Sequence, residues 1–353
     1  MTGDAVVATA PPADRTGALL SVRDLTVRFP TRRGPATVVA GVSFDVQPGR
    51  TLAIVGESGS GKSVSTLAIT GLLAGTSAQV SGSAVLEGTE LIGAGEGTLR
   101  RIRGNRIGMV FQDPMTALNP VLTVGRQITE SMRTHLGLSR AEARDRAVEL
   151  LGLVGIPDPA RRLDDYPHRF SGGMRQRVMI AIGLACSPDL LVADEATTAL
   201  DVTTQAQIVE LVLRLQQELG MAVLWITHDL GVVARIAHRV AVMYAGRILE
   251  EADTDALFAQ PRHPYTNGLL GALPLAGRPS EELATIPGMP PDPTALPIGC
   301  VFHPRCGQRR DARCATEAPP LREAAPGHLV RSFYDDPDPV RAGSVAAVPG
   351  DAA

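Results

Sequence analysis

The stretch Gly56-Glu-Ser-Gly-Ser-Gly-Lys-Ser63 decides the fold, because it fills every specified position of a G-x-x-x-x-G-K-[ST] phosphate-binding loop. It lies directly after the apolar run Thr51–Val55 and directly before a helix-like stretch over Val64–Leu73. In such a strand–loop–helix unit, backbone N–H groups enclose phosphates and the helix N-terminus adds its positive end. The alternative to a phosphate-binding loop is a plain Gly/Ser-rich turn between a strand and a helix. Such a turn would not explain why every specified position of the motif is filled. The sequence therefore predicts a site for a nucleoside triphosphate.

Every residue of this loop is a candidate for nucleotide binding. Lys62 is expected to reach the β- and γ-phosphates, and Ser63 to offer its hydroxyl to Mg²⁺. The candidate set is Gly56, Glu57, Ser58, Gly59, Ser60, Gly61, Lys62 and Ser63.

Length and composition narrow the remaining classes of protein. A chain of 353 residues with 44% hydrophobic residues can form a large α/β domain with an appendage. Its net charge of −3 argues against a general nucleic-acid coat. Four cysteines, three of them near the C-terminus, do not resemble a secreted disulfide framework. Because no signal peptide or membrane-spanning apolar run is evident, we expect cytosolic chemistry and membrane contact only through a partner.

The order of apolar patterns predicts an α/β architecture. Alternating residues over Leu19–Phe29 and Gly41–Val46 indicate antiparallel strands with one wet face. Further along, short strands alternate with helices, which is typical of a mostly parallel sheet covered on both faces. The expected strands are Thr51–Val55, Arg106–Phe111, Leu190–Asp194, Ala222–Thr227 and Val240–Tyr244, and the expected helices are Val124–His135, Arg140–Val154, Gly173–Ala185 and Thr204–Leu219.

The chain is expected to divide into four parts. Residues 1–17 read as a disordered leader, and 18–272 as the main domain with a helical insertion at about 113–187. Residues 273–335 form a Pro-rich C-terminal extension with a cysteine cluster, and 336–353 read as a disordered tail.

A second anchor is the run Leu190-Leu-Val-Ala-Asp-Glu195, which predicts a buried strand with carboxylates at its C-terminal tip. Asp194 is placed to hold Mg²⁺. Glu195 leaves the strand in another direction, toward an attacking water. Beside a complete phosphate loop, the two acids are expected to be functional rather than structural.

The segment Phe170-Ser-Gly-Gly-Met-Arg-Gln-Arg-Val178 reads from its residues alone as a serine-capped helix start. It also resembles the signature motif of ABC-transporter ATPases, with Met174 where many members carry Gln. Phosphate loop, signature, acidic strand, Ala199-Leu-Asp201 and Ile226-Thr-His-Asp229 follow in the order of that family. The resemblance covers roughly residues 19–272. It implies an ABC cassette, a P-loop NTPase with a mostly parallel core, an antiparallel β subdomain and a helical insertion.

The resemblance also implies roles for single residues. Glu195, His228 and Lys62 would be catalytic, with Glu195 polarising the water and His228 contacting the γ-phosphate. Gln112 would touch Mg²⁺ together with Ser63 and Asp194. Phe29 would stack on adenine, although an edge-strand core residue explains it equally well. In this family the signature residues serve the ATP of the partner subunit, which here would be Ser171, Gly172, Gly173 and Met174, and Asp201 would cross to that subunit.

The C-terminal region resembles one branch of the family. Phe258-Ala-Gln-Pro-Arg-His-Pro-Tyr265, Ile286-Pro-Gly-Met-Pro-Pro291 and Gly299-Cys-Val-Phe-His-Pro-Arg-Cys306 are similar to the tail of oligopeptide/dipeptide and nickel importer ATPases. This implies a second, related ATPase subunit, two transmembrane permeases and an extracytoplasmic solute-binding protein, with no nucleic acid. The chain would lie peripherally on the cytoplasmic face of the membrane. A soluble ABC ATPase acting on DNA or ribosomes is the alternative, but no heptad-rich coiled coil is present.

Three cysteines, Cys300, Cys306 and Cys314, cluster in this tail. Soft thiolates on an irregular segment suit an iron–sulfur cluster or zinc. The resembled family often carries a fourth cysteine, and the pattern suggests a [4Fe–4S] cluster, but the fourth position here falls near Ser332. Three possibilities stand: a cluster completed by another group, a Cys₃His zinc site using His303 or His328, or reduced structural thiols.

Overall fold

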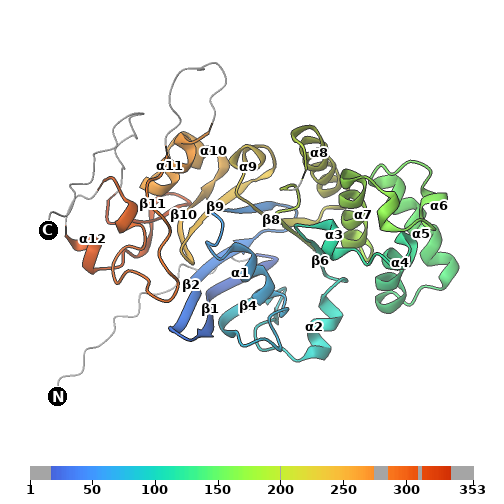
Figure 1. The fold of residues 1–353 in the computed structure, drawn as a ribbon, viewed down its shortest axis with the longest axis horizontal. Helices are drawn as coiled ribbons and strands as arrows, with labels where there is room; N and C mark the ends of the chain where they lie inside the picture. Colours follow the sequence, from blue (N-terminus) through green and yellow to red (C-terminus); the bar gives the residue numbers. More distant parts are fainter. Residues whose placement is uncertain (1–16, 199, 274–284, 309–311, 335–353) are drawn as a thin grey trace.

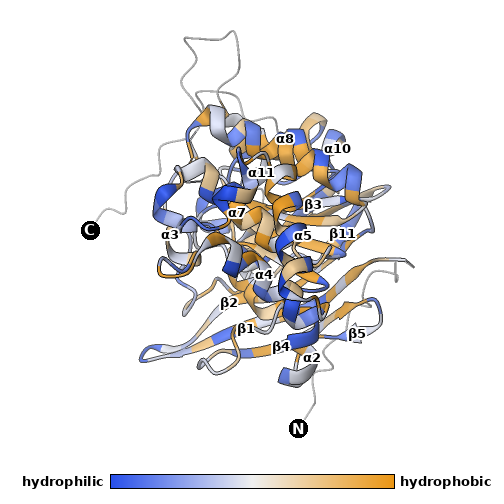
Figure 2. Ribbon diagram, turned by 90° about the vertical axis from the view of Figure 1, so that its right-hand side faces the viewer, coloured by the Kyte–Doolittle hydropathy of each residue, from blue (hydrophilic) through white to orange (hydrophobic). Residues whose placement is uncertain are grey.

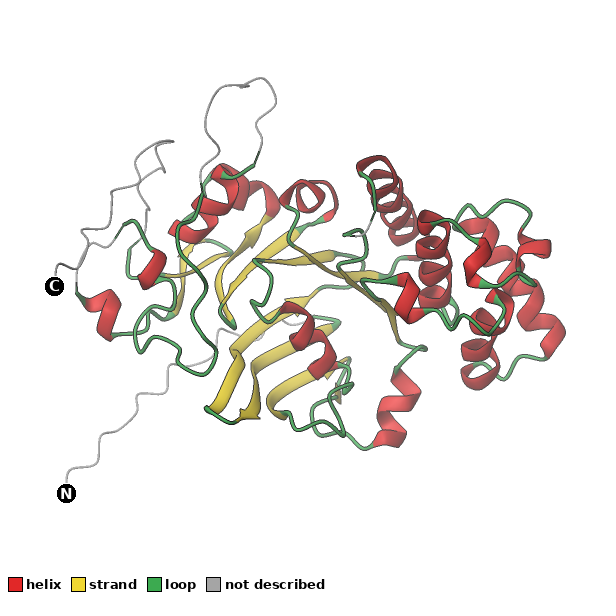
Figure 3. Cartoon of the chain, in the orientation of Figure 1, coloured by secondary structure: helices red, strands yellow, loops and turns green. Residues whose placement is uncertain are grey.

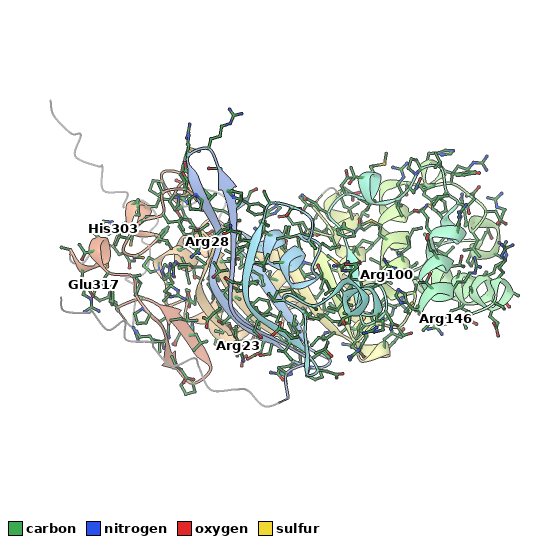
Figure 4. The ribbon with its side chains drawn as sticks, turned by 90° about the horizontal axis from the view of Figure 1, so that it is seen from below. Arg23, Arg28, Arg100, Arg146, His303 and Glu317 are labelled. Carbon is green, nitrogen blue, oxygen red and sulfur yellow. The ribbon has the colours of Figure 1, made fainter. Side chains whose placement is uncertain are left out.

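The computed structural model describes residues 17–198, 200–273, 285–308 and 312–334. It is elongated, with strands in the middle, a group of helices at one end and the C-terminal region at the other (Figures 1 and 3). Figure 4 shows the same separation from below, with Arg146 on the helical end and His303 and Glu317 on the C-terminal region. The expected leader and tail lie outside the described residues, except for residue 17.

An antiparallel sheet covers one side of the phosphate loop. Its strand order is β2-β1-β4-β5, with β1 Leu20–Thr31, β2 Gly34–Val46, β4 Gln79–Leu86 and β5 Thr89–Glu90. Buried side chains alternate with partly or fully exposed ones along most of β1, as predicted for a sheet with one wet face. The second strand begins at Gly34 rather than Gly41, because β1 and β2 pair up to a tight turn at Thr31↔Gly34.

The central sheet has eight strands in the order β11-β12-β10-β9-β3-β8-β7-β6. The strands from β9 to β6 pair in parallel, and β10, β12 and β11 extend that sheet in antiparallel fashion. The bounds are β3 Thr51–Val55, β6 Ile107–Val110, β7 Leu190–Asp194, β8 Ala222–Thr227, β9 Arg239–Tyr244, β10 Arg247–Asp253, β11 Leu321–Ala325 and β12 His328–Arg331. Every residue of β3, β7 and β8 is buried, so the sheet is covered on both faces. Figure 2 shows these interior strands as largely hydrophobic.

Helices cover this sheet and form the insertion. Around the sheet lie α1 Lys62–Ile69, α8 Val202–Leu219, α9 Leu230–Ile236, α10 Thr254–Ala259 and α11 Pro264–Gly271, whereas α2 Glu96–Ile102 lies below it, next to the antiparallel sheet (Figure 1). Between β6 and β7 the chain forms α3 Pro114–Ala117, α4 Val124–His135, α5 Arg140–Leu153, α6 Pro159–Arg162, the 3₁₀ turn η1 Pro167–Arg169 and α7 Gly172–Leu184. The expected mostly parallel core, antiparallel β subdomain and helical insertion are therefore all present.

The C-terminal region is built into the main domain rather than linked to it. Besides β11 and β12, it contains the 3₁₀ turn η2 His303–Arg305 and α12 Arg313–Thr316. Val301 and Phe302 are buried in one apolar cluster with residues of β3, β9 and α11. Phe302 also packs against the rings of Tyr244 and Tyr265, at centroid distances of 5.4 and 5.3 Å. This core brings the C-terminal region up to the phosphate loop.

Candidate active site

The phosphate loop joins the end of β3 to the start of α1, and two of its glycines have no possible substitute. A Cβ on Gly56 would lie 2.0 Å from the carbonyl oxygen of Met243. A Cβ on Gly61 would lie 2.5 Å from the carbonyl oxygen of Val38, and Gly61 has the left-handed φ of 103°. The loop is thus held between β2 and β9, with Ser58 and Gly59 exposed at its tip and Ser60 buried.

Lys62 points back into this loop. Its Nζ donates to the carbonyl oxygens of Gly56 at 2.7 Å and Glu57 at 2.9 Å, and the residue is only 4% exposed. Burial lowers the pKa of Lys62, although the nearby carboxylates of Glu195, Asp194 and Glu57 act to raise it. A buried ammonium group surrounded by acceptors is suited to bind phosphate oxygens.

Ser63 and Asp194 come together from the two sides of the site. The Ser63 hydroxyl donates to Asp194 Oδ1 at 2.7 Å. Burial raises the pKa of Asp194, and the neighbouring Glu195 charge acts in the same direction. Hydroxyl and carboxylate oxygens are the ligands that Mg²⁺ prefers, so this pair fits the metal that the sequence predicts.

Glu195 is the meeting point of three other side chains. Gln112 Nε2 donates to Glu195 Oε2 at 2.9 Å, and Thr198 Oγ1 donates to the same oxygen at 3.1 Å. His228 Nδ1 lies 3.7 Å from Glu195 Oε1, and the His228 side chain is half exposed. The structure therefore assembles the predicted residues Gln112, Glu195 and His228 at the carboxyl ends of adjacent strands.

The backbone at Glu195 explains how this convergence arises. Its φ of 49° lies in the left-handed region, which turns the chain sharply after β7. Asp194 therefore faces α1 while Glu195 faces Gln112 and His228. Such a conformation costs free energy for a residue other than glycine and is concentrated at functional sites.

The signature residues lie at the start of α7 and have a clear structural role. Ser171 is the N-cap, and its hydroxyl accepts from the Met174 N–H at 3.4 Å. Gly173 faces α8, since a Cβ there would lie 2.7 Å from Thr204 Cγ2. Asp201 caps α8 by accepting from the Thr204 N–H at 2.9 Å. Signature and Asp201 therefore share one surface.

That surface is separate from the phosphate loop of the same chain. Within the described part of the chain, no hydrogen bond or ion pair joins residues 171–174 or Asp201 to residues 56–63. Figure 1 places α7 on the helical side of the molecule, away from α1.

Two contacts of the site were missed by sequence reasoning. Thr198 orients Glu195, and Gln205 Nε2 donates to Asp229 Oδ2 at 2.7 Å, which joins α8 to the residue after His228. Only the short spacing from Glu195 to Thr198 could have suggested the first contact. Nothing in the sequence brings Gln205 to Asp229.

Phe29 lies on β1 and is half-buried against the core that contains the antiparallel sheet. This packing matches the core alternative and leaves part of the ring accessible. Its stacking on adenine stays a prediction.

The cysteine cluster does not form a recognisable metal site. Cys300, Cys306, Cys314 and Ser332 line one small pocket, and the Cys300 N–H donates to the Cys314 carbonyl at 2.9 Å. Among the described residues, no group of three His, Cys, Asp or Glu side chains is arranged to hold a metal ion. His328 is bound to Glu250 at 2.6 Å, so it does not complete a zinc site. Burial raises the pKa of Cys300, which favours the thiol.

Cys186, expected within the helix after the signature, lies just beyond the end of α7 and is buried there as a core residue. In the described parts of the chain, no helix is both long enough and apolar enough to cross a bilayer.

Comparison with known proteins agrees with this geometry. Residues 39–198 match the family model described as ABC transporter, and residues 249–314 match the one described as oligopeptide/dipeptide transporter, C-terminal region. The second match begins inside β10, earlier than the predicted extension at 273.

Curated relatives match over most of the chain. The dipeptide transport ATP-binding protein DppD of Escherichia coli is 50% identical, covering 90% of this chain and 97% of the relative. The oligopeptide transport ATP-binding protein OppD of Bacillus subtilis is 50% identical, covering 92% and 91%.

Among solved structures, the dimeric bacterial ABC transporter cassette MJ0796 is 29% identical, with a TM-score of 0.60 over 67% of this chain and 98% of that chain. The chain therefore belongs to the ATP-binding subunits of the oligopeptide/dipeptide family of ABC transporters.

Proposed function

We propose that this chain hydrolyses ATP to drive the import of dipeptides or oligopeptides through two transmembrane permeases. The observation that carries the proposal is the convergence of Lys62, Ser63, Asp194 and Glu195 around the end of the phosphate loop. The named functions of its relatives, dipeptide and oligopeptide transport, supply the class of solute.

In the proposed site the phosphate loop and Lys62 bind the β- and γ-phosphates of ATP. Ser63 and Asp194 would hold Mg²⁺, and Gln112, which donates to the adjacent Glu195, would be a further ligand. When bound, Mg²⁺ would neutralise charge on the phosphate oxygens. Catalysis of phosphoryl transfer rests on such positioning and electrostatic stabilisation.

Glu195 is the proposed general base that polarises the attacking water. Its carboxylate is oriented by Gln112 and Thr198, which both donate to Oε2, and this leaves Oε1 toward His228. His228 is half exposed, so it is free to contact the γ-phosphate. The three residues thereby link water activation to recognition of the γ-phosphate.

The proposed assembly contains two cassettes, two permeases and an extracytoplasmic binding protein, with this chain peripheral on the cytoplasmic face of the membrane. The separation of signature and phosphate loop supports a dimer in which Ser171, Gly172, Gly173 and Met174, together with Asp201, serve the ATP of the opposite subunit. The second cassette is proposed to be a related but different chain.

We propose that the three C-terminal cysteines are reduced thiols that pack the pocket, because the described residues form no metal-ligating group there and Ser332 lines the same pocket. Iron, acid-labile sulfide and zinc analysis of anaerobically purified protein tests this. Stoichiometric iron with sulfide, or stoichiometric zinc, would contradict it.

The proposed function is tested by reconstituting the chain with its permeases and second cassette in vesicles. We expect ATP hydrolysis that increases when a peptide-loaded binding protein is added, together with peptide uptake. The control is Lys62→Ala, which removes the charge facing the phosphates and should weaken ATP binding. Hydrolysis without any response to peptides would contradict the proposed transport role.

A further inference from the structure

Glu57, the second residue of the phosphate loop, is held from two directions by the C-terminal half of the chain. Its backbone N–H donates to Tyr265 Oη at 3.0 Å, and its carboxylate accepts from Arg305 Nη1 at 3.1 and 2.8 Å. Tyr265 is the second residue of α11, and Arg305 ends the turn η2. Tyr265 and Arg305, each more than 200 positions from Glu57 in the sequence, thus hold this one residue of the loop.

Arg305 is part of a built site and not a surface cation. Its side chain is 6% exposed, whereas that of Glu57 is 26% exposed. Nε donates to the Pro287 carbonyl at 2.9 Å, and Nη2 donates to the Ile286 carbonyl at 3.1 Å. Every nitrogen of the guanidinium group is therefore engaged, which the single ammonium group of lysine cannot reproduce.

The pair matters because of where Glu57 lies. A carboxylate in a loop that receives phosphates repels them unless its charge is balanced. Glu57 also acts electrostatically on Lys62, and its carbonyl oxygen accepts from Lys62 Nζ at 2.9 Å. Without Arg305, an unbalanced Glu57 would compete with the phosphates for Lys62.

We propose that Arg305 is a positioning residue of the nucleotide site, through which the C-terminal region sets both the charge and the shape of the phosphate loop. The inference rests on the proposed function, because it concerns binding of ATP at that site. It gives the C-terminal region a direct part in nucleotide binding.

The test uses the full-length chain and measures KM and kcat for ATP. Arg305→Met keeps the apolar stem of the side chain and removes its charged guanidinium group, and it should raise KM about tenfold while kcat stays within about twofold. Arg305→Lys keeps the positive charge but lacks the planar guanidinium group with its several donors, so its KM should lie between those of Arg305→Met and the wild type.

A second substitution separates positioning from folding. In the Arg305→Met background, Glu57→Gln removes the unbalanced carboxylate and should bring KM back to within about threefold of the wild type. A purely structural role for Arg305 predicts no such rescue. A double variant that binds ATP more weakly than Arg305→Met alone would overturn the proposal.

The matched control is Arg239→Met. Arg239 ties β9 to Glu251 and to the Gly327 carbonyl of the C-terminal hairpin, at 2.9 and 3.0 Å, without touching the loop. Its KM should be close to that of the wild type, and a rise equal to that of Arg305→Met would overturn the proposal. If wild-type protein does not hydrolyse ATP, the proposed function is wrong. The role of Arg305 in nucleotide binding is still tested in that case, by measuring the dissociation constant of a fluorescent ATP analogue for the same variants.

Discussion

At the scale of single residues, Glu195 combines a strained backbone with a carboxylate that three side chains approach. We expect Glu195→Gln to bind ATP with near-normal affinity and to lower the hydrolysis rate by at least ~10², because it removes the group that polarises water and leaves the phosphate loop intact. Single-turnover hydrolysis and equilibrium binding of ATP measure the two effects. Turnover near that of the wild type would remove Glu195 from the role of base.

Asp194 illustrates the conflict between function and stability. Because burial raises its pKa above the ordinary 3.8, the folded state binds a proton more tightly than the unfolded state. The free energy of unfolding therefore decreases as pH rises from 3.8 to the raised pKa of Asp194. Above the raised pKa, the cost of burying the charged carboxylate is fully present. We expect Asp194→Asn to raise the melting temperature at neutral pH by a few degrees in the absence of Mg²⁺.

Two measurements check this expectation. The gain in melting temperature should shrink as pH falls toward 3.8. Hydrolysis should be lost because the substitution removes a proposed Mg²⁺ ligand. A variant that melts below the wild type at neutral pH would show that the hydrogen bond from Ser63 outweighs the cost of burying the charge.

The candidate site was largely predictable at this scale because its residues lie in short, fixed motifs. The phosphate-loop motif defines the geometry of the loop, and Asp194 and Glu195 come at the end of a strand whose other residues are all apolar. The contact of Gln205 with Asp229 was not predictable, since it depends on how α8 and the end of β8 meet in space. The Thr198 contact is local, but no sequence motif marks it.

At the scale of elements, the clearest difference between prediction and structure is the hairpin of β11 and β12. Its residues, Leu321–Ala325 and His328–Arg331, show neither a long apolar run nor strict alternation. Tertiary contacts stabilise the hairpin instead. Its strand β12 pairs with β10, and His328 is hydrogen-bonded to the fully buried Glu250. Such a strand depends on its partner and not on its own propensity.

The segment between Gln112 and α4 carries apolar side chains that face solvent. Met115 is 63% exposed and Val121 is 75% exposed. Because this segment follows Gln112 directly, we expect a short permease helix to dock there. The double variant Met115→Ser, Val121→Ser should lose transport and stimulation by peptides while keeping basal hydrolysis.

Transport and ATPase assays in vesicles measure both outcomes, with Met289→Ser as the control, since Met289 is 85% exposed in the C-terminal region. Normal transport by the double variant, or cross-linking of the permease to another surface, would exclude this docking site.

At the scale of the whole molecule, the helical insertion and the C-terminal region lie at opposite ends of the central sheet (Figures 1 and 4). The phosphate loop lies between them. It contacts the C-terminal region through Glu57 and Arg305, while Glu195 beside the loop contacts Gln112, which precedes the helical insertion. This arrangement places the proposed nucleotide site between the surface expected to meet the permease and the C-terminal region.

The separation of the signature from the loop of the same chain leads to a prediction about assembly. In a Glu195→Gln background, ATP should hold two cassettes together, and Ser171→Arg should abolish that dimer without weakening ATP binding. Ser171 is exposed and bonds only locally to Met174, whereas the loop that binds ATP is untouched. Light scattering after size-exclusion chromatography, with the chain alone and with its second cassette, measures the mass in ATP. A Ser171→Arg variant that still doubles its mass would place the signature outside the dimer interface, and one that loses ATP affinity would show that the signature serves the nucleotide of its own chain.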